Sequence, residues 1–338
     1  MKKFYSVFFI IIGLTLALGV NSLPTYAAEQ VTTLKFSCQF PAVHKVALLK
    51  VEWGKEVEKR TNGKVKVEVY PGAVLTPPAQ TYDSVKKGIA HVGETFASYT
   101  SGRFPLTEAV DLPLGYKSAL QGTRLANAFY KQFKPKEFDD VQVMFFHTAA
   151  PQIVCTKTPV YKLEDLKGMK IRSTGTSSQI VQALGAAPVA MSMGEAYDAL
   201  SRGVVNGVVG PVEVIKGWKL GEVVNNCTSY GSAHVNAAFV IMNKGKWNAF
   251  PKDIQKIIEQ VNEEFAEKQG KLWDELDKEG EDLLIKQGGK LIKLSKEEDA
   301  RWKAAVKPLL DDYVKNSKAK GLPGDEALKF VQDFVAKN

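Results

Sequence analysis

Arg172 is the side chain whose sequence context most strongly suggests a chemical role. It ends an alternating apolar and basic stretch, Met169 to Arg172, which predicts a short strand with one buried face. A Ser/Thr/Gly run then leads into a helical pattern from Ile180 to Leu184, and backbone N–H groups at a helix start favour an anion. Open α/β sheets bind ligands at the carboxyl ends of strands. A guanidinium there can hold a carboxylate through two parallel hydrogen bonds, which lysine cannot imitate. The alternative interpretation is a solvated arginine that ends an edge strand.

Motifs for catalysis, metals and cofactors are not found in the sequence. The chain has no Gly-x-Ser-x-Gly elbow, no His-Glu-x-x-His pair, no phosphate-binding loop and no Gly-x-Gly-x-x-Gly turn after a strand. Its four histidines, His44, His91, His147 and His234, have no partners at metal-ligand spacing. We therefore predict no catalytic residue, no metal and no cofactor. His44 is kept as a candidate ligand contact because it follows the first predicted strand, where a cleft should lie.

The three cysteines, Cys38, Cys155 and Cys227, lie far apart in the sequence. An odd number in an exported chain leaves at least one free thiol or an intermolecular bond. Cys155 and Cys227 can pair if both belong to one domain, and the sequence leaves open whether any disulfide forms.

Residues 1–28 have the organisation of a signal peptide. Two lysines precede an apolar core from Phe8 to Val20, and a small-x-small triplet ends at Ala27. We expect cleavage near Ala27 or Ala28 and a soluble, periplasmic protein that is not embedded in the membrane. Without the two lysines, 43 basic residues face 37 acidic ones, a formal charge of +6. The two signs are interspersed, so nucleic-acid binding is not indicated.

The mature chain of about 310 residues exceeds the usual size of one hydrophobic core and indicates two domains. Strand and helix patterns alternate along its first part, which is typical of a doubly wound α/β domain. A loop from Ser98 to Tyr116 with two prolines should border a cleft. The predicted elements of this part are strands at Leu34–Phe40, Val65–Val69 and Ile89–Gly93, helices at Val46–Val57, Tyr82–Lys87 and Thr123–Phe133, and a strand at Val141–Phe146.

The second part continues the alternation after Gln152. Its predicted elements are a helical turn at Leu163–Lys167, the strand that ends at Arg172, helices at Gln179–Leu184 and Gly194–Leu200, strands at Pro188–Met191, Val204–Val209 and Val235–Met242, a helix at Trp302–Lys315, and a C-terminal helix.

The longest helical pattern runs from Pro251 to Gln287. Its apolar residues recur at helical spacing along one face, with Glu and Lys elsewhere. An unbroken helix of 37 residues would extend roughly 55 Å, which exceeds one domain. Gly270 and Gly280 weaken the prediction, because each costs about 1 kcal/mol relative to alanine. A coiled coil is the alternative, but the apolar stripe does not keep a strict heptad.

Several stretches resemble one family of transport receptors. The segments Glu164–Arg172, Gly88–Gly93 and Gly102–Leu106 are similar to DctP-type solute receptors of tripartite ATP-independent periplasmic (TRAP) transporters. The resemblance implies a two-lobed α/β periplasmic binding protein fold with a central ligand cleft, hinge strands and a long helix spanning both lobes. It also implies that Arg172 holds the substrate carboxylate. The implied division is lobe I at residues 29–149 plus about 236–275, and lobe II at 150–235 plus about 276–338.

Two departures from the family pattern bear on the ligand. Phe96 falls where the family's sugar-acid receptors have a carboxylate that binds substrate hydroxyls, and Gln152 falls where they have a second arginine. Both argue against a sugar acid or a dicarboxylate. The hypothesis is a small organic monocarboxylate with an apolar or aromatic body, delivered to an ion-coupled TRAP membrane permease.

The remaining candidate contacts follow from positions near the expected cleft. Phe40, Phe96, Tyr99 and Phe239 lie at or just after strand ends, where core packing is the alternative for each. We expect polar contacts from Gln39, His44, Gln152 and Asn236, apolar ones from Phe96 and Phe239, and a turn at Gly210 and Pro211 that abuts the ligand. A sensory receptor of the same fold remains an alternative. So does a periplasmic enzyme acting on carboxylic acids, although it needs a base or nucleophile beside Arg172.

Overall fold

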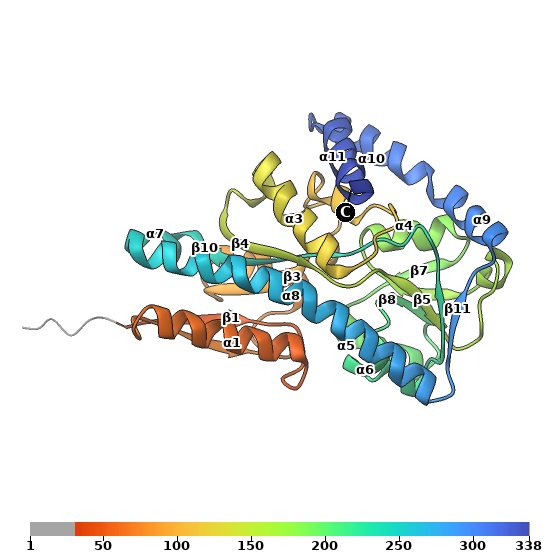
Figure 1. Ribbon diagram of the computed structural model, residues 1–338, viewed down its shortest axis with the longest axis horizontal. Coiled ribbons are helices and arrows are strands. Elements are labelled where there is room, and N and C mark those ends of the chain that lie inside the picture. The colour runs from red at the N-terminus through yellow and green to blue at the C-terminus, as the bar shows by residue number, and fades with distance from the viewer. Residues whose placement is uncertain (1–30, 338) are drawn as a thin grey trace, which may run out of the picture.

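The computed structural model describes residues 31–337 and contains two β-sheets, each at the centre of one lobe (Figure 1). The predicted signal peptide and its cleavage site lie outside the described residues. Lobe I is built on a sheet with the strand order β2 (Val65–Tyr70), β1 (Thr32–Ser37), β3 (Val92–Phe96), β10 (Ala237–Asn243) and β4 (Val141–Thr148). Lobe II is built on a sheet with the order β11 (Lys290–Lys293), β9 (Asn226–Ser229), β5 (Ile153–Thr156), β8 (Gly207–Gly210), β6 (Lys170–Ser173) and β7 (Ala187–Ala190).

The two strands that follow a crossing between the lobes, β5 and β10, run opposite to their neighbours in the sheet. The chain passes from β4 of lobe I into β5 of lobe II, and it returns from β9 to β10. β5 and β10 run antiparallel to both of their neighbours. Two such crossings next to each other restrict the relative motion of the lobes to a hinge.

The long helix α8 (Lys252–Lys286) spans both lobes, as predicted (Figure 1). In lobe I it contacts α1 (Lys45–Arg60) and α3 (Ala119–Phe133), and in lobe II it contacts α6 (Val214–Gly217) and β11. Its two glycines, Gly270 and Gly280, lie where the backbone of another segment approaches the helix closely. A Cβ at Gly270 would lie 3.0 Å from the Leu120 Cα atom of α3, and one at Gly280 would lie 2.3 Å from the backbone oxygen of Val212.

Replacing Gly280 with alanine is therefore expected to lower the free energy of unfolding, although alanine is the better helix former. Overpacking of this kind typically costs about 1–3 kcal/mol. Gly194, in α5 (Met193–Ser201), is the matched control, because a Cβ there would meet only the Ser192 hydroxyl at 3.8 Å. Gly194→Ala should stabilise by about 0.4–1 kcal/mol. Urea unfolding of both variants tests this, and equal effects would contradict it.

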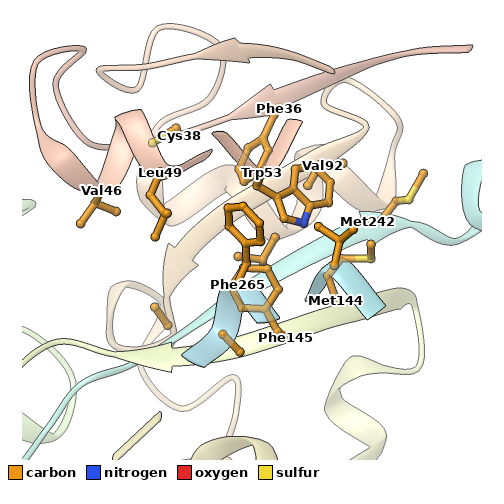
Figure 2. Packing of buried hydrophobic residues seen from close by; sticks show 14 of the residues in the cluster. Phe36, Cys38, Val46, Leu49, Trp53, Val92, Met144, Phe145, Met242 and Phe265 are labelled. Carbon is orange, nitrogen blue, oxygen red and sulfur yellow. The ribbon is translucent and has the colours of Figure 1, made fainter. Parts of the chain in front are cut away.

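Alternate residues of β10 pack into two different cores. Ala238, Val240 and Met242 belong to the core beneath α1 and α8, part of which Figure 2 shows. Ala237, Phe239 and Ile241 belong to the core on the other face, beneath α2 (Thr81–Lys86) and α3. Successive strand residues point to opposite faces, so helices on both sides of lobe I bury the strand completely. This is the doubly wound arrangement expected for lobe I.

The C-terminal helices correct the predicted lobe boundary. One helix was expected at Trp302–Lys315, but the chain forms α9 (Lys296–Val306) and α10 (Pro308–Ala319), because Pro308 starts a new helix at its first position. Trp302 of α9 packs in lobe II. Tyr313 of α10 donates its hydroxyl proton to the Leu106 carbonyl in lobe I, and α11 (Gly324–Lys337) packs in the same core. Helices α10 and α11 thus belong with lobe I and not with lobe II.

Lobe II also has helices on both faces of its sheet. α5 and α6 pack on one side, and α4 (Thr176–Ala183) and α9 on the other.

Cys155 of β5 and Cys227 of β9 are paired across neighbouring strands and form a disulfide, while Cys38 is a buried free thiol in lobe I. The short helix α7 (Lys244–Asn248) follows β10 in lobe I.

Candidate functional site

A cavity of about 420 Å³ lies between the lobes. The structure brings six of the nine predicted contacts to its wall. They are Gln39, Phe96, Gln152, Arg172, Pro211 and Asn236.

Arg172 lies near the carboxyl end of β6 and is only 3% exposed. Its Nε donates to the Met191 carbonyl at 3.0 Å, and its Nη1 donates to the Val209 carbonyl at 3.4 Å. Among residues 31–337, no carboxylate oxygen lies within 4.0 Å of a nitrogen of this guanidinium, so Arg172 forms no ion pair. Burial lowers the pKa of Arg172, an effect that the nearby Tyr99 hydroxyl and the Glu195 carboxylate partly offset. The side chain is therefore held in place by neutral oxygens, and it has no direct ion-pair partner among the described residues.

Side chains from both lobes meet beside this arginine. The Thr174 hydroxyl of lobe II donates to Ser98 of lobe I at 3.1 Å, and the Met193 N–H donates to the Tyr99 hydroxyl at 3.3 Å. Gly175 has φ +52°, and a Cβ there would lie 2.9 Å from the Ser98 Cα atom. Only glycine combines this backbone conformation with such a close approach of the two lobes.

Five aromatic rings form much of the apolar part of the cavity wall. Ring centroids are 5.8 Å apart for Phe40 and Trp218, 5.7 Å for Phe40 and Trp273, and 6.1 Å for Phe96 and Tyr99. All five residues line the cavity. Such rings favour a flat apolar or aromatic ligand, which can make offset or edge contacts with them.

Glu213 is a cavity residue that the sequence did not reveal. It is 1% exposed, and its Oε1 lies 2.7 Å from His44 Nε2. His44 begins α1, and its Nδ1 accepts a hydrogen bond from the Val46 N–H, so the proton lies on Nε2 and is donated to Glu213. The predicted contact of His44 with the ligand is thus corrected: His44 does not line the cavity and instead holds Glu213.

Two more predicted contacts lie outside the cavity wall. Phe239 is fully buried among Tyr82, Phe104 and other rings of lobe I. Successive residues of β10 point to opposite faces of the sheet, so Phe239 points to the face opposite that of Ala238. Gly210, at the end of β8, lies behind the wall, where a Cβ would meet Val214 and Met193. Of that predicted turn, only Pro211 borders the cavity.

Gln152 and Asn236 supply polar groups at the hinge side of the cavity. Gln152 Nε2 donates to the Ala150 carbonyl at 2.8 Å, and Asn236 Oδ1 accepts from the Ser177 hydroxyl at 3.3 Å. Ser177 Oγ also lies 2.7 Å from His234 Nε2, a serine–histidine contact that sequence reasoning missed.

This serine–histidine pair is poorly suited to nucleophilic catalysis. The other ring nitrogen of His234 faces the Tyr230 hydroxyl at 3.3 Å, and not a carboxylate that would stabilise an imidazolium. Burial lowers the pKa of His234 to about 3, which makes it a weak base at neutral pH. Neither Ser177 nor His234 lines the cavity. The pair instead holds the segment just before β10 against the start of α4.

Metal-binding clusters and membrane-spanning helices are both absent from the described part of the chain. Residues 31–337 contain no group of three or more His, Cys, Asp or Glu side chains arranged to hold a metal ion. None of the helices among these residues is both long and apolar enough to cross a membrane.

Comparison with known proteins gives a consistent family. Residues 40–316 match the family model "Bacterial extracellular solute-binding protein, family 7", DctP. The chain is 26% identical over 330 residues to the outer membrane transporter protein TsaT of Comamonas testosteroni. This alignment covers 94% of this chain and 96% of that protein.

Two solved structures of TRAP solute-binding proteins are similar throughout. One comes from an unidentified marine microbe, is described as specific for aromatic acids, and was crystallised with 3-hydroxybenzoate. Its TM-score is 0.87 and its sequence identity is 31%, and the match covers 91% of this chain and 99% of that one. The other, from Rhodoferax ferrireducens, contains copurified benzoate; it has a TM-score of 0.86 and 26% identity, covering 91% and 98%.

Proposed function

The chain belongs to the DctP family of bacterial extracellular solute-binding proteins, the receptors of TRAP transporters, and we propose that it captures a small aromatic monocarboxylate. In this proposal the acid binds in the cavity between the lobes. The liganded receptor then delivers it to an ion-coupled TRAP membrane permease. Transport, and not turnover, is the activity that the cavity supports best.

The observation that carries the proposal is the buried Arg172 guanidinium, which has no direct ion-pair partner among the described residues and lies in a cavity lined by aromatic rings. A buried cation without a counter-ion is costly, and a ligand carboxylate would supply that counter-ion. Two charge-assisted hydrogen bonds contribute about 3–6 kcal/mol together. Micromolar affinity requires about 8 kcal/mol, so burial of an apolar ring between the aromatic side chains would supply the remainder.

The ligands of the two similar structures support the same class. Both 3-hydroxybenzoate and benzoate combine one carboxylate with one aromatic ring. Phe96 and Gln152 also fit this class, because neither can neutralise a second carboxylate or bind several hydroxyls as a carboxylate does.

A thermal-shift measurement on the mature protein tests the proposal. Benzoate and the hydroxybenzoates, at about 100 times the dissociation constant, should add about 2.7 kcal/mol and raise the melting temperature by about 5 °C. Succinate and glucuronate, the matched dicarboxylate and sugar acid, should leave it unchanged. Stabilisation by those two and not by aromatic acids would contradict the proposed ligand class.

A further inference from the structure

Two side-chain atoms of the cavity wall are buried without a hydrogen-bond partner among residues 31–337. They are Oε2 of Glu213, an acceptor, and Nε2 of Gln39, a donor. Both residues lie in the wall that also carries Arg172. Leaving such groups unpaired is unfavourable, so a ligand that satisfies them gains affinity over one that does not.

The Glu213 carboxylate is fixed, so its unpaired oxygen has a defined position. His44 holds Oε1, and the backbone N–H of Glu213 donates to Asp277 Oδ1 of α8 at 3.1 Å. A Cβ at Gly217 would lie 1.7 Å from Oε1, so that glycine leaves the room the carboxylate occupies. The side chain is therefore positioned before any ligand binds, which reduces the entropy lost on binding.

We propose that Glu213 selects the ligand by accepting a hydrogen bond from a hydroxyl on its aromatic ring, while Arg172 holds its carboxylate. The inference rests on the proposed function and narrows it to hydroxy-substituted aromatic monocarboxylates. A hydroxyl also has an oxygen that can accept a hydrogen bond from an amide such as that of Gln39. A second carboxylate in the same place would meet the Glu213 carboxylate and be repelled.

Calorimetric titration of the mature protein provides the test. The ligands are benzoate, the three hydroxybenzoates, their methyl ethers, and isophthalate, a benzene ring with two carboxylates. We expect the best hydroxybenzoate to bind at least about tenfold more tightly than benzoate, since a hydrogen bond to a charged group has this effect. Its methyl ether, which cannot donate, should lose that advantage, and isophthalate should bind more weakly than benzoate.

The variant Glu213→Gln removes the charge with little change of shape. It should reduce the preference for the hydroxyl to about threefold or less and improve isophthalate binding relative to benzoate. Glu222→Gln is the matched control, because Glu222 lies in the same lobe and accepts from the Tyr197 hydroxyl outside the cavity. A role confined to holding the lobes together through His44 would weaken all ligands equally and leave their ratios unchanged.

The outcomes separate this inference from the proposed function. If benzoate binds and the hydroxybenzoates bind within threefold of it, the inference is wrong and the proposed function stands. An unchanged hydroxyl preference in Glu213→Gln likewise overturns the inference, and the wild-type ligand series decides the matter if the variant does not fold. If no aromatic monocarboxylate binds the wild type, the proposed function fails, and the inference fails with it.

Discussion

Replacement of Arg172 by methionine should weaken the binding of benzoate by about 100-fold or more. The change removes two charge-assisted hydrogen bonds worth about 3–6 kcal/mol, and each 1.4 kcal/mol is a factor of about ten. Arg172→Lys keeps the charge but replaces the planar fork with a point charge, so it should restore only part of the affinity. Titration calorimetry with benzoate measures both variants.

The same substitution, Arg172→Met, is expected to raise the free energy of unfolding of the ligand-free protein. The Arg172 guanidinium is buried, and its hydrogen bonds to carbonyl oxygens do not neutralise its charge. Replacing buried charge with an apolar side chain of similar volume is often stabilising by about 1–4 kcal/mol. Ligand-free Arg172→Met should therefore unfold at a higher urea concentration than the wild type, after both have been refolded to remove any copurified acid.

Arg202→Met is the matched control for both measurements. Arg202 is an exposed residue at the end of α5, outside the cavity. It should change neither affinity nor stability by more than about 0.5 kcal/mol. Benzoate binding to Arg172→Met within threefold of the wild type would exclude Arg172 as the anchor. A loss of both affinity and stability would indicate general damage to lobe II.

Local patterns were enough to locate the arginine. Strand β6 and helix α4 begin within a few residues of their predicted positions. The signals for both elements are local: alternating apolar and basic residues, a glycine at the turn before them, and Ser, Thr and Gly at the helix start. The long helix α8 was predicted for the same reason. Its glycines, which seemed to weaken the prediction, are required by the close approach of Leu120 and Val212.

Other parts of the site depend on contacts that the sequence does not display. Glu213 gains its importance through His44, 169 residues away. Trp273 continues the apolar stripe of α8, so nothing local distinguishes it from a core residue, yet it lines the cavity. Phe239 failed as a ligand contact because its direction is set by the pairing of β10 with β3 and β4.

Three short strands of lobe II were not predicted. They are β5, β9 and β11. None of them alternates apolar and polar residues throughout, and these strands are defined by their partners in the sheet. The C-terminal helices, by contrast, were predicted as helices but placed on the wrong lobe. An apolar helix face indicates that it is buried without indicating against what.

Removing one partner from a network of buried polar and charged side chains in lobe I should be strongly destabilising. Lys50 Nζ lies 2.9 Å from Glu94 Oε1, and His147 Nε2 lies 2.6 Å from the same oxygen. All three side chains are at most 2% exposed. Trp273 Nε1 donates to His147 Nδ1 at 3.2 Å, which connects the network to the cavity wall. Because Nδ1 accepts this bond, the neutral His147 donates its Nε2 proton to Glu94.

Lys50→Met is expected to lower the free energy of unfolding by about 3–5 kcal/mol, because it leaves the Glu94 carboxylate buried without its cation. The double variant Lys50→Met/Glu94→Gln should recover most of this loss, since no uncompensated charge remains. Lys45→Met is the control, because Lys45 is half-exposed and pairs with Glu279 at the surface, where such pairs contribute at most about 1 kcal/mol. Urea unfolding at pH 7 measures all three.

The pH dependence of unfolding provides an independent test of the same network. Burial alone would raise the pKa of Glu94, but Lys50 and His147 outweigh burial and hold the pKa at about 2, below the ordinary value of 4.5. A carboxyl whose pKa is lower in the folded state stabilises the protein above its unfolded pKa. That stability should disappear as the pH falls from about 4.5 to about 2. The double variant, in which this carboxylate is absent, should lose less stability over the same interval. Parallel pH profiles for the two proteins would show that Glu94 is not held ionised by Lys50, and the large effect expected for Lys50→Met would then have no electrostatic basis.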